Sequence, residues 1–269
     1  MNDLEKRFAA ARRRAIATDY AHLNPRQLEG VLTTEGPLLL LAGAGSGKTT
    51  VLINRVANLL RYGRGSDTEE IPLPISQDEV EFLEQYATAP DPEQRPLMQY
   101  LCAVEPARPW EVLAITFTNK AAKEMAERIA KLAGAEAAEV WVSTFHACCA
   151  RILRRDIDKL GYKPSFTIYD ADDQKTLIKE ICRKMNIDTK KVKERALLAQ
   201  ISHAKDELLS PDEMEMNAGA DFNQKRAAQV YREYQAALRR NNALDFDDLI
   251  CKTVELLSLI HISEPTRLL

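Results

Sequence analysis

The strongest structural signal in this sequence is the segment Ala42-Gly43-Ala44-Gly45-Ser46-Gly47-Lys48-Thr49. The apolar run Leu38-Leu39-Leu40-Leu41 precedes it, and a pattern typical of an amphipathic helix follows it. Glycines let backbone N–H groups curl around phosphate oxygens, and the N-terminus of the following helix adds partial positive charge. The order strand, glycine-rich loop and helix therefore predicts a phosphate-binding P-loop.

Two side chains of this segment carry the expected chemistry. In such a loop Lys48 reaches the β- and γ-phosphates, and the hydroxyl of Thr49 is a ligand for Mg²⁺. We therefore expect a nucleoside triphosphate with Mg²⁺, and we take Lys48 and Thr49 as the catalytic candidates. The expected nucleotide contacts are Ala42, Gly43, Ala44, Gly45, Ser46, Gly47, Lys48, Thr49 and Thr50. The strict motif begins with glycine where Ala42 stands, and kinases, GTPases, transporters and helicases all share it.

Further strand–helix units follow along the chain. Apolar runs at residues 112–117 and 140–142 each precede a helical pattern, and the second helix is expected to end near Gly161. Apolar strands that alternate with amphipathic helices favour a parallel sheet with helices on its faces. We therefore expect an α/β domain over residues 1–160, with its first strand at residues 38–41.

The remaining segments differ in composition. Residues 64–109 are acidic and rich in proline, and we interpret them as a surface insertion with one short helix near residues 80–83; a disordered linker is the alternative. Residues 161–240 have a helical pattern and predict a helical subdomain, after which residues 241–256 return to the first domain. A basic run between Arg183 and Arg195 is either a solvated face or a surface that follows nucleic acid.

Composition limits the class of protein. The net charge of −3 gives no global signature of nucleic-acid binding, although local basic patches remain compatible with it. The cysteines have no CxxC spacing, which argues against a disulfide framework or a zinc site. No apolar signal segment or bilayer-length apolar run occurs, so we expect a cytoplasmic protein without a membrane partner.

Further segments occur in an order that is similar to a known family. They are Leu23-Asn24-Pro25-Arg26-Gln27 before the P-loop, then Thr116-Phe117-Thr118-Asn119-Lys120-Ala121-Ala122-Lys123-Glu124-Met125, Ser143-Thr144-Phe145-His146 and Leu244-Asp245-Phe246-Asp247-Asp248-Leu249. With the P-loop, they resemble the UvrD/PcrA/Rep group of superfamily 1 DNA helicases over about residues 20–255, apart from the acidic insertion. The segment at residues 116–125 is the most specific part of this resemblance.

The resemblance implies a RecA-like P-loop NTPase domain interrupted by an inserted all-helical subdomain. It also implies an ATP-dependent DNA helicase that uses ATP and Mg²⁺, moves 3′ to 5′ on single-stranded DNA and acts at DNA duplex junctions. Gln27 would hydrogen-bond the adenine. The DNA-binding residues would be Phe117, Thr118, Asn119 and Lys120 in a first segment and Thr144, Phe145 and His146 in a second. Both segments follow predicted parallel strands, at the edge where α/β sheets bind ligands.

Several positions depart from the family pattern. Thr50 stands where many relatives have arginine, and Ser143 where they often have glycine. The segment Asp245-Phe246-Asp247-Asp248 follows a polar run rather than an apolar strand, so we interpret it as a helix start and not as the Walker B acids. The Walker B acids and a second RecA-like domain are missing from the sequence, so we expect this part alone to bind nucleotide but hydrolyse it poorly.

The last residues are also unusual. Residues 257–269 do not resemble the family but resemble a translated sequencing-library adapter, and we interpret them as a non-native tail; a genuine divergent tail is the alternative. Other functions stay open at this stage. They are the helicase part of a helicase–nuclease similar to AddA or RecB, a short non-motor P-loop protein that binds nucleotide, and a small-molecule kinase.

Overall fold

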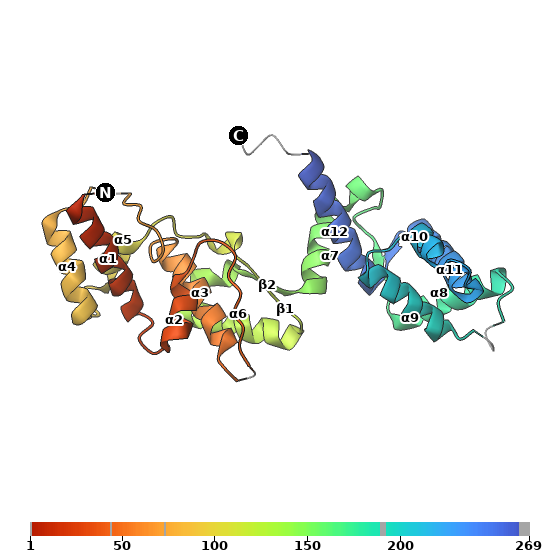
Figure 1. The fold of residues 1–269 in the computed structure, drawn as a ribbon, viewed down its shortest axis with the longest axis horizontal. Coiled ribbons are helices and arrows are strands. Elements are labelled where there is room, and N and C mark those ends of the chain that lie inside the picture. Colours follow the sequence, from red (N-terminus) through yellow and green to blue (C-terminus); the bar gives the residue numbers. More distant parts are fainter. Residues whose placement is uncertain (1, 44, 73, 189–191, 264–269) are drawn as a thin grey trace. The chain divides into compact units, whose positions relative to one another are not determined.

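The computed structural model describes residues 2–43, 45–72, 74–188 and 192–263, and the chain forms two compact units, Met1–Thr144 and Phe145–Leu269 (Figure 1). The first unit contains α1 (Asp3–Thr18), α2 (Pro25–Leu32), α3 (Lys48–Tyr62), α4 (Gln77–Thr88), α5 (Arg95–Cys102), η1 (Pro109–Glu111), β1 (Leu113–Thr116), α6 (Asn119–Ala133), η2 (Ala135–Glu139) and β2 (Trp141–Thr144). The second unit contains α7 (Phe145–Asp156), η3 (Ile157–Leu160), β3 (Thr167–Ile168), α8 (Ala171–Lys184), α9 (Glu194–Asp206), α10 (Pro211–Asn217), α11 (Phe222–Arg240), β4 (Ala243–Leu244) and α12 (Phe246–Ser263). The protein is thus mixed α/β and mostly helical, with short parallel sheets.

A parallel pair of strands lies beside the P-loop helix in the first unit. β1 and β2 pair in register from Leu113 opposite Trp141 to Thr116 opposite Thr144. Side chains of α3 and α6 pack on this pair and form a core of Ile53, Val56, Ala114, Met125, Ile129, Ala137 and Val140. The predicted strands at residues 112–117 and 140–142 and their parallel direction are therefore confirmed.

The predicted strand at residues 38–41 is not formed. Among the described residues, no strand pairs with this segment. Leu39 is 78% exposed and Leu41 is 85% exposed. A strand inside a parallel sheet needs a hydrogen-bonded neighbour and apolar cover on both faces. β1 and β2 pair with each other, and within the described ranges the run of leucines has no hydrogen-bonded neighbour.

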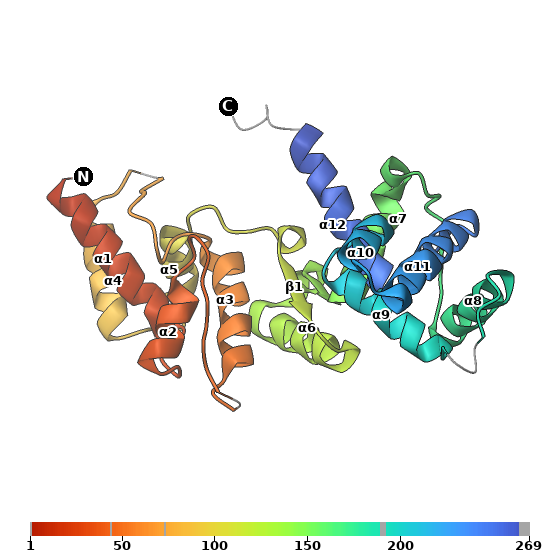
Figure 2. The ribbon, with the colours of Figure 1, turned by 45° about the vertical axis from the view of Figure 1, so that its right-hand side comes forward.

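The acidic insertion contains two helices that pack on the N-terminal helix. α4 and α5 bury Val80, Leu83, Tyr86 and Met98 in one core with α1 side chains such as Ile16. α1 and α4 lie side by side in both views (Figures 1 and 2). The sequence predicted one short helix in this insertion, but the structure contains two, and the alternative of a disordered linker is wrong. Apolar residues spaced three apart, such as Val80, Leu83 and Tyr86, form a buried helix face despite the acidic composition.

The second unit has two cores. The larger one is shared by α8, α9 and α11, and the other joins α7, η3 and α12 with Phe166 and Leu244. β3 and β4 form a short parallel pair that places Thr167 opposite Ala243. α12 continues from residue 246 into the predicted tail, whose residues 264–269 lie outside the described residues, as do Lys190 and Lys191 of the basic run.

The described parts of the chain contain no candidate membrane span. None of their helices combines the length and the apolar composition that crossing a bilayer demands.

Candidate functional site

The P-loop leads into α3 with an open helix N-terminus. Gly47 is the N-cap residue of α3, with φ +84°, and no side chain caps the first turn. Lys48 Nζ donates to the carbonyl oxygens of Ala42 and Gly43, both at 2.6 Å, and Ser46 Oγ donates to Gly43 O at 2.7 Å. The first amide groups of α3 and the Lys48 ammonium are thus gathered at one point, as phosphate binding requires. Ala44 lies outside the described residues.

Gln27 lies against the same loop. Asn24 caps α2 in a capping box whose third helical residue is Gln27. The Gln27 amide nitrogen donates to Ser46 O at 3.1 Å, and a Cβ atom built on Gly47 would lie 2.6 Å from that nitrogen. The structure therefore brings the predicted base-recognition residue to the P-loop, and the positive φ at position 47 favours glycine there.

A cavity of about 680 Å³ opens between α2 and the P-loop. Its lining includes Gln27, Leu40, Ser46 and Lys48, so one wall is apolar and the other is polar. Thr49 is exposed in the first turn of α3, where its hydroxyl offers the oxygen ligand that Mg²⁺ prefers. The volume lies in the ordinary range for small-molecule sites, about 300–1,000 Å³, and the donors suit a nucleoside triphosphate with Mg²⁺.

Arg128 contacts the first part of α3, although the sequence did not single it out. It is exposed on α6, and its Nη2 atom lies 3.3 Å from Thr50 Oγ1 in α3. Thr50 is the position where relatives of the resembled family often carry arginine. A guanidinium group thus reaches this position from another helix. The sequence could not predict this contact, because it joins residues 50 and 128 only through the tertiary fold.

The first predicted DNA segment follows β1. Phe117 is 87% exposed, and Thr118 caps α6 by accepting from Ala121 N at 3.1 Å. Asn119 begins α6, and the Lys120 side chain is 88% exposed, with its Nζ atom 4.0 Å from Glu124 Oε1. The segment therefore presents an aromatic ring and a cation at one helix N-terminus, while Thr118 also has a structural role.

The second predicted segment follows β2. Thr144 is buried at the end of that strand, Phe145 is 41% exposed, and His146 is exposed on α7. The His146 ring meets the edge of Phe246, with ring centroids 5.6 Å apart and an angle of 74°. Phe246 is itself 46% exposed and was not among the predicted site residues, although it lies in a quoted motif.

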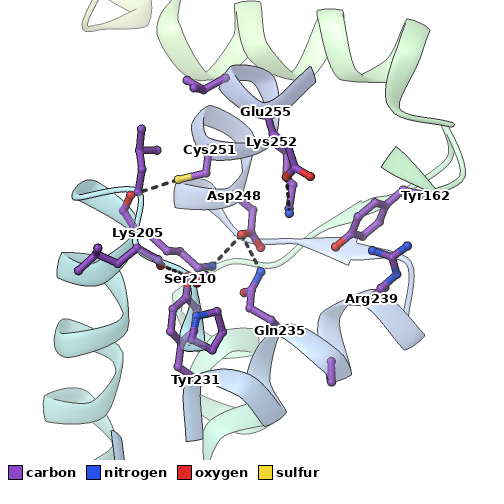
Figure 3. Close-up of a pocket in the computed structure, with 15 residues that line it drawn as sticks. Tyr162, Lys205, Ser210, Tyr231, Gln235, Arg239, Asp248, Cys251, Lys252 and Glu255 are labelled. Atoms are coloured by element: carbon purple, nitrogen blue, oxygen red, sulfur yellow. Dashed lines mark hydrogen bonds and ion pairs between the residues drawn. The ribbon is translucent and has the colours of Figure 1, made fainter. Parts of the chain in front are cut away.

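The acidic motif at residues 245–248 starts a helix around a buried lysine (Figure 3). Lys205 Nζ lies 2.7 Å from Asp245 Oδ2 and 2.9 Å from Asp248 Oδ1, and all of these side chains are at most 3% exposed. Asp248 N donates to Asp245 Oδ1 at 2.8 Å, and the Gln235 amide donates to Asp248 Oδ1 at 3.1 Å. The interpretation of this motif as a helix start, rather than a metal-binding acid pair, agrees with this geometry.

Burial and neighbouring charges shift the pKa values of Lys205 and Asp248 in opposing directions. Burial lowers the pKa of Lys205, but Asp248 and Asp245 outweigh that effect and raise it, so the ammonium stays charged. Burial raises the pKa of Asp248, and the neighbouring Asp245 adds to this against the opposing effect of Lys205. Burial and the ion pair with Lys205 thus act on the pKa of Asp248 in opposite directions, and burial is the larger effect.

Comparisons with known proteins agree with the motifs. Residues 23–72 and 96–266 match the model of the UvrD/REP helicase N-terminal domain. The chain is 43% identical over 235 residues to the ATP-dependent DNA helicase PcrA of Staphylococcus aureus (strain NCTC 8325 / PS 47), which is 87% of this chain and 26% of that protein. PcrA of Bacillus subtilis (strain 168) is 43% identical over 234 residues, with the same coverage. The chain thus spans about a quarter of the length of these relatives.

Proposed function

The chain belongs to the UvrD/REP helicase family, and we propose that it forms the nucleotide-binding part of an ATP-dependent helicase that moves 3′ to 5′ on single-stranded DNA. The observation that carries this proposal is the meeting of Gln27, Lys48 and the uncapped N-terminus of α3 at one cavity. A triphosphate and a purine base would be held there by separate groups, which is the arrangement that ATP requires.

Each side chain has a definite task in this proposal. Lys48 exchanges its bonds to the Ala42 and Gly43 carbonyls for the β- and γ-phosphates, so the loop is shaped before the ligand arrives. Thr49 supplies a hydroxyl to Mg²⁺, which neutralises charge developing on the phosphates when it is bound. Gln27 hydrogen-bonds the adenine, and Arg128 supplies the guanidinium that position 50 lacks.

Single-stranded DNA would contact the segments that follow β1 and β2. Phe117 stacks on a base without sequence preference, which is worth about 1–3 kcal/mol per base. Lys120 and the Asn119 amide bind phosphate oxygens, and His146 with Phe246 offers a second pair of rings. Neither segment needs base-edge contacts, so the proposal predicts binding that depends on the backbone rather than the sequence.

Hydrolysis requires groups that the described residues do not supply. Asp245 and Asp248 are committed to Lys205, so they are not available to hold Mg²⁺ or orient water. We propose that the acids come from a further strand that pairs with residues 38–41, which would also cover the exposed Leu39 and Leu41. This chain alone is then expected to bind ATP while turning it over poorly.

The test of the proposed function is ATP binding by the chain and by Lys48→Ala. The wild type is expected to bind ATP with Mg²⁺, and the variant to lose that binding while its circular dichroism spectrum and unfolding midpoint stay the same. Equal ATP affinity in both proteins would remove the P-loop assignment. ATP turnover by the wild type that ignores added DNA would instead favour a small-molecule kinase.

A further inference from the structure

Two segments outside the family match form one structural unit. Residues 1–22 and 73–95 are unmatched, and they contain α1 and α4. Although far apart in the chain, the two helices share one core made of Phe8, Ala11, Ala15, Ile16, Val80, Leu83 and Tyr86. Arg7 also forms a bidentate ion pair with Glu84, in which Nη2 donates to Oε2 at 3.0 Å and Nε donates to Oε1 at 3.3 Å. Because each helix buries its apolar stripe against the other, we name them the accessory pair.

Asp19 attaches the accessory pair to the P-loop helix. It is the C-cap residue of α1, and its side chain is 7% exposed. Its Oδ2 atom accepts from Tyr62 OH at 2.7 Å and from Arg95 Nη2 at 2.9 Å, and lies 3.9 Å from Arg61 Nη1. Burial and the Asp19 charge raise the pKa of Tyr62, so this hydroxyl stays a donor. Since Tyr62 is the last residue of α3, Asp19 fixes the end of α1 to the end of α3.

The same carboxylate lies at the start of the segment that carries Gln27. After Asp19, the buried Tyr20 accepts at its carbonyl from Leu23 N at 2.9 Å, which closes a turn leading directly to Asn24, the N-cap of α2. Gln27 then donates to the P-loop at Ser46 O, 3.1 Å away. The segment from Asp19 to Gln27 is therefore held at both of its ends, at the C-terminus of α3 and at the loop before its N-terminus.

We propose that Asp19 is a positioning residue for Gln27, through which the accessory pair sets the preference of the site for adenine. This inference rests on the proposed function, in which Gln27 hydrogen-bonds the base. Replacing the carboxylate by an amide removes the charge that attracts Arg61 and Arg95 and leaves one weaker oxygen acceptor for Tyr62 OH and the guanidinium groups, so the anchor of the turn before α2 is weakened. Lys48 and Thr49 belong to α3 itself, so phosphate binding stays as it is. The effect on the base is thereby separated from the effect on the phosphates.

The experiment measures the affinities of fluorescently labelled ATP and GTP for the complete chain. Wild type, Gln27→Ala, Asp19→Asn and Glu81→Gln are compared. Glu81→Gln makes the same type of change, carboxylate to amide, at an exposed position of α4. Gln27→Ala and Asp19→Asn are each expected to lower the ATP-to-GTP affinity ratio about tenfold, which equals the loss of one good hydrogen bond. GTP affinity, which reports the phosphates, is expected to change less than about twofold, and Glu81→Gln to match the wild type.

Several results would overturn the proposal. Asp19→Asn with the wild-type ratio would show that Gln27 does not depend on Asp19, and an equal loss of ATP and GTP would show a merely structural role. If Asp19→Asn fails to fold, Tyr62→Phe retains the ring and removes one bond to the carboxylate, and an unchanged ratio there has the same meaning. A wild type that binds ATP and GTP equally would contradict the role of Gln27 itself, and this proposal would fall with it.

Discussion

At the scale of single residues, Gly47 combines a left-handed backbone conformation with a close approach to the Gln27 side chain. Its φ of +84° lies in the left-handed region, and a Cβ atom there would meet the Gln27 amide nitrogen at 2.6 Å. Gly47→Ala is therefore expected to displace Gln27 and lower ATP affinity by at least about tenfold, as measured by titration. Gly36→Ala is the matched control, because φ is +70° there and a Cβ atom meets nothing within 4 Å. Equal ATP affinities in the two variants would contradict the clash.

Lys205 carries a second prediction at this scale. Lys205→Met leaves the carboxylates of Asp245 and Asp248 buried without a cation, and removing one partner of a buried pair costs about 3–5 kcal/mol. Urea unfolding at neutral pH measures the loss. Lys252→Met is the control, because that lysine forms its ion pair with Glu255, a half-exposed carboxylate, and such surface pairs contribute about 1 kcal/mol or less. Similar losses in the two variants would show that the buried lysine is not needed.

Asp248 also makes a pH-dependent contribution to stability. The folded-state pKa of Asp248 is raised by burial, so the folded state binds protons more tightly than the unfolded chain and this contribution to stability grows as the pH falls. Without Lys205 the pKa of Asp248 rises further. The gap in unfolding free energy between wild type and Lys205→Met is thus expected to narrow from pH 7.5 to pH 5.5. A gap that widens on acidification would contradict this assignment.

At the scale of elements, local signals predicted what local contacts determine. The helical pattern after residues 112–117 is confirmed as α6, which the Thr118 hydroxyl caps by accepting from Ala121 N. The strands at residues 112–117 and 140–142 were found because each has a partner within this chain. Residues 38–41 carry an equally apolar run but no such partner, and α4 was underestimated because its acidic residues concealed the spacing of Val80, Leu83 and Tyr86. Sequence patterns indicate which side chains are apolar enough to be buried, but not whether a neighbouring strand is present to pair with them.

The exposed leucines lead to a prediction for that segment. Leu39 is 78% exposed, so Leu39→Ser is expected to change the unfolding free energy of this chain by less than about 0.5 kcal/mol. Ile53, on the neighbouring helix α3, is 3% exposed, and Ile53→Ala is expected to cost about 2–5 kcal/mol. Denaturant unfolding compares the two variants. A loss for Leu39→Ser that approaches the loss for Ile53→Ala would show that residues 38–41 are paired and covered.

At the scale of the whole molecule, the order of motifs predicted the family, and the residues proposed to bind nucleotide and DNA come from the same motifs. Arg128 and Phe246 were not predicted, because their contacts, with Thr50 in the first unit and with His146 in the second, arise only in the folded chain. The accessory pair was missed for a different reason, since α1 and α4 are each ordinary amphipathic helices and their pairing leaves no mark in either segment. The motifs therefore named the candidate residues, whereas the tertiary contacts around those residues could be seen only in the structure.

The final prediction concerns the proposed binding of single-stranded DNA by a chain whose net charge is negative. With a net charge of −3, global attraction cannot hold a polyanion, so binding must come from local contacts that release counterions. The affinity for oligo-dT is expected to fall steeply with salt, as fluorescence anisotropy would show. Lys120→Ala should flatten the logarithmic slope by about 0.7, the value for one phosphate contact on a single strand. Phe117→Ala should weaken binding by about 1–3 kcal/mol at every salt concentration without changing the slope.

Lys131, at the far end of α6, provides the control for this experiment. It is exposed like Lys120 and lies on the same helix, but in its last turn rather than beside the aromatic segment. Lys131→Ala is therefore expected to bind oligo-dT as the wild type does. Equal effects of Lys120→Ala and Lys131→Ala would mean that DNA responds only to the overall charge. A change of slope in Phe117→Ala would mean that the ring orders phosphate contacts rather than stacking on a base, because stacking itself releases no counterions.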